Sequence, residues 1–405
     1  MKKILVLGGG ADQKDLILDL KQRGYYTILI DYYQNPIAKN VADKHIQEST
    51  LDKEKVLKIA QLENVDNIIT ACTDQALLTV AYVAEKLNFP TQFSYQQALN
   101  ITNKLYMKKI MWENGIPTSR YKCITDANED ISDLQFPLMV KPADCNGSFG
   151  VRKAENEEDF KTFFRQAVQL SRSKSAIVEE FKEGIEVGID CYIIDGKSTI
   201  LMMGQVNKKK IGDSVLLIFQ TIIPALISDN VKCKIQNIAN QIASSFNLNN
   251  TPLLIQTLVN GEDVNVIEFA ARIGGASKHR TIRIKTGFDI LHANIDSVFG
   301  FIPEVRTVHD SSYYSRNHVY TYPCVYDRVE NCDVLIAENI IEEFIPYKTS
   351  GMLVEDSLAS RDRIGSFLVK ASSIVELNEK IRIAVDRLRV YDKDGNEVMR
   401  RDIFA

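Results

Sequence analysis

Apolar and polar positions follow two different patterns along the first part of the chain, one typical of strands and one typical of helices. Mostly apolar runs at 4–7, 27–31 and 67–71 predict short strands, and periodic stretches at 12–23, 53–62 and 75–87 predict helices. Regular alternation of strand and helix is typical of a small parallel sheet covered by helices. Gly8, Gly9 and Gly10 lie at the first turn from strand to helix. We therefore expect an α/β unit at this end of the chain.

The pattern changes after a helix predicted at 103–113, which ends at Asn114-Gly115 and is followed by Pro117. Beyond this boundary, strands predominate. The pattern predicts strands at 136–141, 176–181, 186–194 and 199–206, helices at 157–170 and 231–246, and a last helix at 374–388. This order of strands and helices is typical of an α+β region. After about residue 305 the chain again mixes strand-like and helix-like patterns.

Residues 254–275, LIQTLVNGEDVNVIEFAARIGG, predict two strands joined by a turn that contains Gly261. Gln256 and Glu268 stand twelve residues apart, one on each arm, as lone polar side chains in apolar strands. A carboxylate is costly to bury unless it is paired, and a divalent cation is its strongest partner. The alternative is an edge strand whose Glu268 faces water. The segment alone leaves both interpretations open.

The N-terminal glycines also match part of a dinucleotide fingerprint. Gly8 and Gly10 fit its first two glycines, and Asp31 lies at a suitable distance to hold a ribose. The third glycine position is Gln13, so the fingerprint is incomplete. Nicotinamide binding stays an alternative, and the simpler interpretation is a turn that shapes a binding cleft or caps a strand.

A second glycine-containing loop follows Lys141, at the end of an apolar strand. Residues 144–150, DCNGSFG, are small or flexible, so backbone N–H groups there can approach phosphate oxygens while the lysine supplies a charge. An exposed hairpin loop with an incidental lysine is the alternative. Residues 177–186, IVEEFKEGIE, then offer free backbone groups for a purine edge and Glu186 for a ribose.

Composition sets broad limits. The 405 residues suffice for two or three domains, and 45% hydrophobic with 25% charged residues is ordinary for a globular protein. A net charge of −4 gives no support for nucleic-acid or membrane partners. The seven cysteines are scattered without a CxxC pair, as expected of reduced thiols. Because no apolar run approaches ~20 residues and the first is too short for a signal peptide, we expect a cytoplasmic protein.

The order of these motifs resembles the ATP-grasp superfamily. The chain is similar to the branch that holds biotin carboxylase, carbamoyl-phosphate synthetase, glycinamide ribonucleotide synthetase and amino-acid ligases, and SRDRIG at 360–365 is similar to a stretch in biotin carboxylase relatives. The resemblance implies a Rossmann-like pre-ATP-grasp domain at 1–98, an ATP-grasp domain at 99–303 with a mobile lid at about 118–182, and a small α+β subdomain at 304–405.

The same resemblance implies roles for single residues. Arg272 and Lys141 would be catalytic, and Gln256 and Glu268 would bind Mg²⁺ or Mn²⁺. The substrate would contact Gly9, Gly10, Arg272, Gly274, Gly275 and His279. ATP would be held by Lys104, Lys141, Gly147, Ser148, Gly150, Glu179, Glu180, Phe181, Lys182 and Glu186.

Two positions depart from the family pattern. Gln256 stands where glutamate is common, although carbamoyl-phosphate synthetases also use glutamine, and Ala270 stands where many relatives have asparagine. Fewer protein ligands are therefore expected, with water and ATP oxygens completing the coordination.

The resemblance implies an enzyme that uses ATP to activate a carboxylate as an acyl phosphate and joins it to an amine. Both substrates would be small molecules, and a homodimer would follow family habit. Glycinamide ribonucleotide synthetase or a carbamoyl-phosphate-synthetase-like ligase is an alternative. An ATP-binding regulatory protein without turnover is another, motivated by the reduced set of metal ligands.

Overall fold

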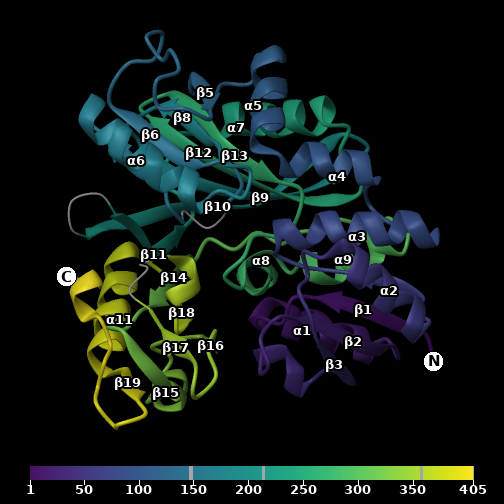
Figure 1. The fold of residues 1–405 in the computed structure, drawn as a ribbon. Coiled ribbons are helices and arrows are strands. Elements are labelled where there is room, and N and C mark those ends of the chain that lie inside the picture. Colours follow the sequence, from purple (N-terminus) through teal and green to yellow (C-terminus); the bar gives the residue numbers. More distant parts are fainter. Residues whose placement is uncertain (146–148, 212–214, 356–358, 405) are drawn as a thin grey trace.

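The computed structural model describes residues 1–145, 149–211, 215–355 and 359–404, and the strands of these residues form four sheets (Figure 1). One sheet is parallel with helices around it, and the others are antiparallel, so the predicted combination of α/β and α+β organisation is confirmed. In this view the N-terminal sheet lies at the lower right and the C-terminal region at the lower left, both below the teal middle part of the chain.

The N-terminal sheet is parallel and has the order β3-β2-β1-β4. Its predicted strands form because their apolar side chains are fully buried against the surrounding helices. The sequence pattern missed β3, which has one apolar residue. The elements are β1 (Lys3–Leu7), α1 (Ala11–Gln22), β2 (Tyr26–Asp31), the 3₁₀ helix η1 (Ile37–Asn40), β3 (Lys44–Gln47), α2 (Lys53–Glu63), β4 (Asn67–Ile69) and α3 (Asp74–Leu87).

The largest sheet has eight antiparallel strands in the order β13-β12-β9-β10-β11-β14-β18-β16. Its strands are β9 (Ile185–Ile194), β10 (Lys197–Ile211), β11 (Val215–Ile223), β12 (Thr251–Asn260), β13 (Asp263–Ala270), β14 (Tyr313–Val319), β16 (Glu343–Pro346) and β18 (Gly365–Ala371). Strand β10 continues five residues beyond the predicted end at Val206. The polar run at 207–210, NKKK, pairs with β11 along a half-exposed part of the sheet.

A smaller antiparallel sheet packs on helix α6 (Glu157–Leu170), with the order β5-β8-β6-β7. Its strands are β5 (Tyr121–Ile124), β6 (Leu138–Pro142), β7 (Arg152–Ala154) and β8 (Ala176–Glu180). Phe160 and Phe164 of α6 fill the core beneath β6 and β8. Figure 1 shows this layer above the β12–β13 end of the large sheet.

Helices cover the apolar face of β9, β12 and β13 and join the large sheet to the N-terminal one. The covering helices are α4 (Tyr95–Thr102), α5 (Lys104–Glu113) and α7 (Asp229–Ser245). Helices α8 (Lys278–Thr286) and α9 (Ile290–Val298) belong to a core shared with β1 and β2. Helix α4 was not predicted, although Ser94 caps it by accepting a hydrogen bond from the Gln97 backbone N–H at 3.2 Å.

The C-terminal region combines the end of the large sheet with a three-stranded sheet of order β17-β15-β19. Because β14 pairs with β11, the large sheet continues across residue 304, where a subdomain boundary was predicted. The remaining elements are β15 (Cys324–Glu330), α10 (Cys332–Ala337), β17 (Leu353–Val354), η2 (Ser360–Asp362), α11 (Ile374–Arg387), β19 (Arg389–Asp392) and η3 (Arg401–Phe404).

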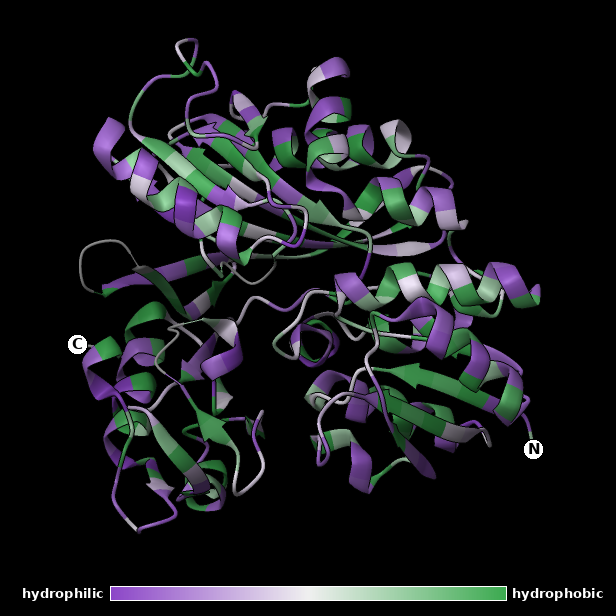
Figure 2. Ribbon diagram, viewed as in Figure 1, coloured by the Kyte–Doolittle hydropathy of each residue, from purple (hydrophilic) through white to green (hydrophobic). Residues whose placement is uncertain are grey.

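The distribution of apolar and polar residues agrees with this packing of helices on sheets. Figure 2 shows apolar residues concentrated along the strands and on the helix faces that cover them, with polar residues on the outer faces. In the described ranges, no helix has both the length and the apolar character that crossing a bilayer requires.

Candidate functional site

The β12–β13 hairpin places its two polar side chains together. Gln256 and Glu268 are direct partners in the strand register, and a register shift follows immediately after Gln256. Directly opposed residues lie on the same face of a sheet. The Gln256 amide donates to Glu186 Oε1 at 3.2 Å, and Glu268 Oε2 lies 3.6 Å from Lys104 Nζ. The hairpin therefore brings two oxygen-bearing side chains to neighbouring positions on one face of the sheet.

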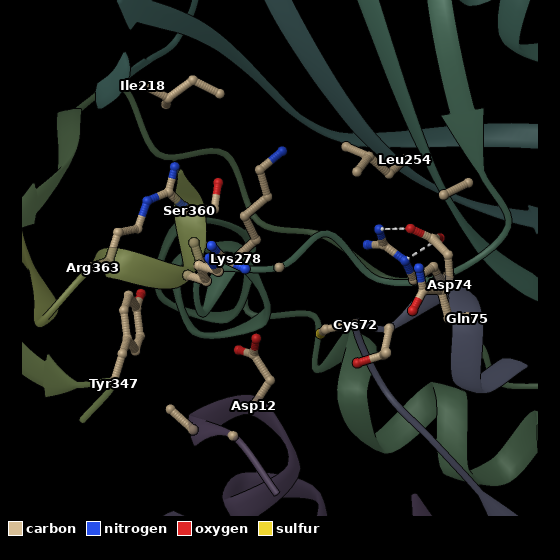
Figure 3. A pocket seen from close by; sticks show the side chains of 18 of the residues that line it. Asp12, Cys72, Asp74, Gln75, Ile218, Leu254, Lys278, Tyr347, Ser360 and Arg363 are labelled. Carbon is tan, nitrogen blue, oxygen red and sulfur yellow. Dashed lines mark hydrogen bonds and ion pairs between the residues drawn. The ribbon is translucent and has the colours of Figure 1, made fainter. Parts of the chain in front are cut away.

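Both residues line a cavity of about 840 Å³. Figure 3 shows other residues of its wall, among them Asp74, Lys278 and Arg363. Its walls come from the N-terminal sheet, from the hairpin and from the C-terminal region. Of the residues predicted from the sequence, those that line it are Gly9, Gly10, Lys104, Glu186, Gln256, Glu268, Arg272 and Gly275. Among the described residues that were predicted, Lys141, Gly150, Glu179, Glu180, Phe181, Lys182, Gly274 and His279 are not part of its lining.

Lys141 belongs to a buried charge cluster on the small sheet. Its ammonium donates to Glu179 Oε2 at 2.9 Å, and Lys108 Nζ lies 3.3 Å from the other oxygen. Burial would raise the pKa of Glu179, but the two lysines outweigh it and lower that pKa to about 2. Glu179, expected at a purine edge, thus has its carboxylate engaged by two ammonium groups.

Lys108 was missed by sequence reasoning. It follows Lys104 by one turn on α5, so the two side chains share a helix face, and this spacing was the available signal. Burial lowers the pKa of Lys108, although Glu179 opposes the shift. In contrast, Glu179 raises the pKa of Lys141 against the effect of burial. The cluster thus sets two lysines against one carboxylate, and none of the three side chains lines the cavity.

Lys104 connects the loop after β6 to the hairpin. It is the first residue of α5, which Asn103 caps by accepting from the Tyr106 N–H at 3.1 Å. Its ammonium donates to the Cys145 carbonyl at 2.8 Å and approaches Glu268. A phosphate between the loop and the hairpin would therefore meet this charge.

Several residues predicted to hold ATP lie along the small sheet and its edges. Gly147 and Ser148 lie outside the described residues. Gly150 has φ +75°, and a Cβ there would come within 2.6 Å of Leu170 Cδ1. Lys182 pairs with Glu180 at 3.3 Å, and Phe181 carries the ammonium of Lys153 4.2 Å from its ring centre.

Arg272 is fixed by a partner from the N-terminal sheet. Its Nε and Nη2 donate to the two oxygens of Asp74 at 2.5 and 2.6 Å, and its Nη1 donates to the Ile273 carbonyl at 2.7 Å. Burial would lower the pKa of Arg272, but Asp74 raises it, so the guanidinium stays charged. Asp74 begins α3 and was not predicted. The bidentate pair holds the arginine in one orientation at the cavity wall.

The Gly9–Gly10 turn is shaped by its own neighbours. Gly9 N donates to Asp31 at 2.7 Å, and Gly10 N donates to Gln13 Oε1 at 3.0 Å. The other oxygen of Asp31 accepts from the Tyr33 N–H at 2.8 Å, so the carboxylate that a dinucleotide ribose would need is used by the backbone. Gln13, at the third glycine position, acts as a local cap. This geometry supports the cleft-shaping interpretation.

The segment after Arg272 places a lysine at the cavity and a histidine behind its wall. Lys278, which was not predicted, lines the cavity and pairs with Asp190 at 2.9 Å. A Cβ at Gly274 would lie 2.5 Å from Lys278 Cδ, so glycine is required for this packing. His279 is 5% exposed, and its Nε2 lies 2.8 Å from Asp15 Oδ2. It has no direct face on the cavity.

The C-terminal region closes the cavity with basic side chains. The lining includes Arg316, His318, Lys348, Arg361 and Arg363, the last two from the SRDRIG stretch. Arg316 is 3% exposed and bonds through Nη2 to Thr281 and Glu343, while its Nε and Nη1 have no partner in the described part of the chain. Burial lowers the pKa of His318 far below its usual range. This wall suits an anionic group.

The order and geometry of these groups agree with a known domain. The family model described as the ATP-grasp domain matches residues 134–279, a stretch that holds Lys141, Glu179, the β12–β13 hairpin and Arg272. The chain contains an ATP-grasp domain.

The relatives of this chain are distant in sequence. The formate-dependent phosphoribosylglycinamide formyltransferase of Ignicoccus hospitalis is 27% identical over 254 residues, which cover 60% of this chain and 62% of that relative. The L-amino acid ligase of Bacillus licheniformis superposes with a TM-score of 0.78 at 18% identity and covers 97% of this chain and 99% of its own.

A biotin carboxylase domain dimer of the 2-oxoglutarate carboxylase from Hydrogenobacter thermophilus, described as a complex with MgADP, ADP and bicarbonate, superposes with a TM-score of 0.77 at 14% identity. It covers 98% of this chain and 91% of its own. The structural likenesses show that this chain shares its fold with these two proteins over nearly its whole length.

Proposed function

We propose that the chain is an ATP- and magnesium-dependent ligase that activates a carboxylate as an acyl phosphate and joins it to an amine. The observation that carries this proposal is the single cavity shared by Lys104, Gln256, Glu268, Arg272 and the turn at 9–10. The cavity thus combines a phosphate-binding charge, two oxygen donors and a fixed arginine with a wall from the N-terminal sheet.

The nucleotide would lie between the small sheet and the hairpin. Lys104 and Lys141 would meet its phosphates, and the strand end at 179–182 would meet the purine through backbone groups, since Glu179 is engaged by lysines. Glu186 is 5% exposed and pairs with Lys208 as well as Gln256. A ribose hydroxyl would compete with these partners for its oxygens.

Magnesium fits the hairpin. Because the Gln256 amide nitrogen donates to Glu186, its carbonyl oxygen is left as a ligand beside the Glu268 carboxylate, and hard cations prefer such oxygens. Ala270 adds no side-chain ligand, so nucleotide and water oxygens would complete the set. The ion would neutralise phosphate charge. The related biotin carboxylase domain described as an MgADP complex supports this assignment.

The proposed chemistry needs charge and alignment more than a protein nucleophile. A carboxylate oxygen of the substrate attacks the γ-phosphorus, the bond to the β-bridging oxygen breaks, and ADP leaves. The amine then attacks the acyl carbon, the bond to phosphate breaks, and the amine loses a proton. Arg272, held by Asp74, would face the transferred group, with Lys104 and Lys141 offsetting its charge.

The relatives favour a small carboxylate and an amine carried by an anionic molecule. The Ignicoccus relative is named for formate and a phosphoribosylated amine. The basic wall around Arg316 and Arg363 would hold the anionic part of such an amine. Formyl transfer from formate is the specific form of the reaction that this likeness supports.

We also propose the domain organisation that the resemblance implies, with boundaries at 98 and 303 and a lid at about 118–182. The proposal includes a homodimer.

A phosphate-release screen tests this function. Carboxylates, formate included, are paired with amino acids and with ribonucleotide amines in the presence of Mg-ATP. We expect release that needs both partners and that Lys141→Met abolishes. Lys122→Met is the matched control, because Lys122 lies on the same small sheet but pairs with the exposed Asp133. Tight Mg-ATP binding with no release for any pair would favour a regulatory ATP-binding protein instead.

A further inference from the structure

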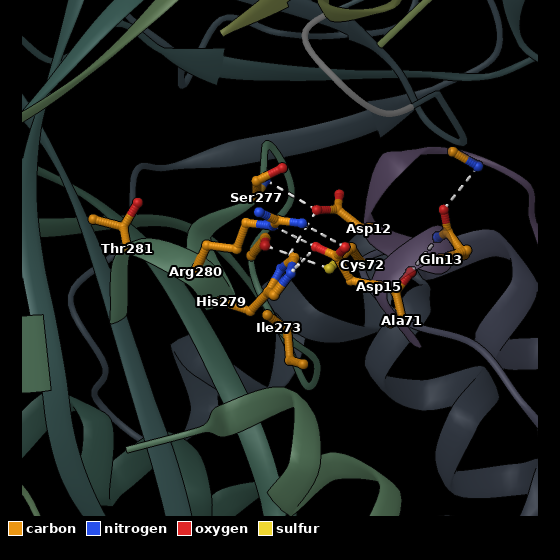
Figure 4. Close-up of polar contacts among 12 residues, drawn as sticks. Asp12, Gln13, Asp15, Ala71, Cys72, Ile273, Ser277, His279, Arg280 and Thr281 are labelled. Carbon is orange, nitrogen blue, oxygen red and sulfur yellow. Dashed lines mark hydrogen bonds and ion pairs between the residues drawn. The ribbon is translucent and has the colours of Figure 1, made fainter. Parts of the chain in front are cut away.

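Three side chains with metal-binding atoms meet where the N-terminal sheet joins α8. They are Asp12 in the first turn of α1, Cys72 between β4 and α3, and His279 in the first turn of α8 (Figure 4). Their ligand atoms all lie within 4.8 Å of one another. None of the three residues belongs to the hairpin that would hold magnesium.

His279 is oriented as metal-binding histidines are. Its Nε2 lies 2.8 Å from Asp15 Oδ2, and the imidazole is 5% exposed. Its Nδ1 has no hydrogen-bond partner in the described ranges and lies 3.5 Å from Asp12 Oδ1. A carboxylate that accepts one ring N–H leaves a lone pair on the other nitrogen, and this arrangement fixes the ring of a ligand histidine.

Among the described residues, Asp12 has no lysine or arginine as an ion-pair partner. Asp12 Oδ1 accepts from the Ser277 N–H at 2.9 Å, and its side chain is 15% exposed. A carboxylate in such surroundings is stabilised by a cation. The basic side chains nearby each have another carboxylate: Arg280 pairs with Asp15, Arg272 with Asp74 and Lys278 with Asp190.

The backbone holds the three ligands in place through uncommon conformations. Cys72, Ala276 and Ser277 have φ of +61°, +62° and +59°, a left-handed region that is costly for residues other than glycine. Cys72 Sγ lies 3.5 Å from the Gly274 carbonyl, and the turn at 276–277 directs the Ser277 N–H at Asp12. Two strained turns therefore converge on one point.

We propose that Asp12, Cys72 and His279 bind one divalent transition-metal ion of the zinc class. A thiolate, an imidazole and a carboxylate suit such an ion, whereas magnesium prefers oxygen ligands alone. The distance of 3.5 Å between His279 Nδ1 and Asp12 Oδ1 is close to the separation of about 3.3 Å between two tetrahedral ligands bound at about 2.0–2.1 Å.

The proposed centre has an open side. Asp12 and Cys72 both line the cavity, while His279 lies behind its wall, so the fourth coordination position faces the space where substrates would bind. Three protein ligands with one open position are the arrangement of a catalytic rather than a closed structural centre. Water or an anionic oxygen of a substrate would occupy that position.

Cobalt alone is the probe for this site. Full-length protein is stripped with a chelator and titrated with Co²⁺. We expect one equivalent to produce a thiolate-to-cobalt charge-transfer band and the strong visible absorption of a tetrahedral ion, both displaced by Zn²⁺. Cys72→Ser removes the charge-transfer band. Asp15→Asn, which alters the carboxylate that contacts His279 Nε2 and also pairs with Arg280, weakens binding about 10–100-fold. Cys233→Ser is the control, because that cysteine is exposed on α7.

Asp12→Asn keeps an oxygen for the Ser277 N–H, so it tests the site if Cys72→Ser does not fold. We expect it to weaken cobalt binding by at least about tenfold, the lower end of the loss for such sites. Equal affinity in wild type and Asp12→Asn, or a charge-transfer band that only Cys233→Ser removes, overturns the proposal. His279 would then only connect the side chains of Asp12 and Asp15.

Discussion

Gln256 and Glu268 stand directly opposite each other on β12 and β13, and the Gln256 amide is tied to Glu186 on the neighbouring strand. The hydrogen bond fixes the orientation of the amide, because only its nitrogen can donate to a carboxylate. As a result, a neutral carbonyl oxygen and a carboxylate form the protein side of the proposed magnesium site. The site carries one negative charge where two glutamates would give two.

Gln256→Glu should therefore tighten metal binding. A second carboxylate adds charge to an oxygen site for a hard cation, and we expect the magnesium concentration for half-maximal activity or nucleotide binding to fall roughly tenfold. Without metal, the new carboxylate would face Glu186 and Glu268, so the melting temperature should fall. Magnesium titrations and thermal unfolding with and without the ion measure both effects. An unchanged magnesium dependence would argue against Gln256 as a ligand.

Lys108→Met should destabilise the fold. Glu179 would keep Lys141 but lose one of two partners in a buried place, and we expect a loss of about 2–3 kcal/mol in the free energy of unfolding. Lys109→Met is the control on the same helix: Lys109 is 63% exposed and pairs with Glu113 at 3.8 Å, so its loss should be below about 0.5 kcal/mol.

Denaturant unfolding gives the free energy of unfolding of the Lys108→Met and Lys109→Met variants. The Glu179→Gln substitution then tests whether the buried charge of Glu179 causes the loss. If the buried charge is responsible, adding Glu179→Gln to Lys108→Met should recover part of the stability. An additive loss in the double variant would contradict a direct pair between the two side chains.

The same cluster predicts a dependence on pH. The pKa of Glu179 falls from its ordinary value of 4.5 to about 2, so the folded state favours the carboxylate. The unfolded chain binds more protons in this window, and stability therefore rises with pH. The contribution, on the order of 3 kcal/mol, is complete above pH ~4.5 and is lost as the pH falls toward 2. The difference in unfolding free energy between wild type and Glu179→Gln should shrink over that range. A difference that stays constant down to pH ~2 would refute the assignment.

The elements that sequence patterns predicted are those whose side chains are nearly all apolar or strictly periodic. Strand β1 and helix α3 are of this kind, since their buried faces are continuous. Strand β3 and the charged end of β10 were missed because pairing with neighbouring strands, and not burial of apolar side chains, makes them strands. Such pairing depends on contacts that a local pattern does not contain.

Some residues of the candidate site could also be predicted from the sequence, and others could not. Gln256 and Glu268 could be predicted because a short hairpin relates their positions locally. Asp74 could not, because its partner Arg272 lies 198 residues away in sequence. The cluster of Asp12, Cys72 and His279 likewise joins three distant segments. Residue types and order predict which groups carry the chemistry, whereas the packing of the sheets decides which of them meet.

Asp74→Asn should reduce turnover without weakening nucleotide binding. The carboxylate holds the Arg272 guanidinium through two hydrogen bonds of 2.5 and 2.6 Å, and the amide can accept only one of them. A freed arginine would shift from its proposed position beside the transferred group, and a displacement of about 1 Å can cost about 100-fold in rate. We therefore expect kcat to fall by about that factor while the Kd for ATP stays within about twofold.

Arg272→Lys should act in the same direction, because lysine keeps the charge but cannot form the bidentate pair. Asp133→Asn is the control for a lost surface carboxylate, since Asp133 is 62% exposed and pairs with Lys122. Steady-state kinetics and equilibrium ATP binding on the three variants separate the effects. A weaker Kd with unchanged kcat in Asp74→Asn would show that the pair holds nucleotide, and the role of Arg272 at the reacting group would have to be abandoned.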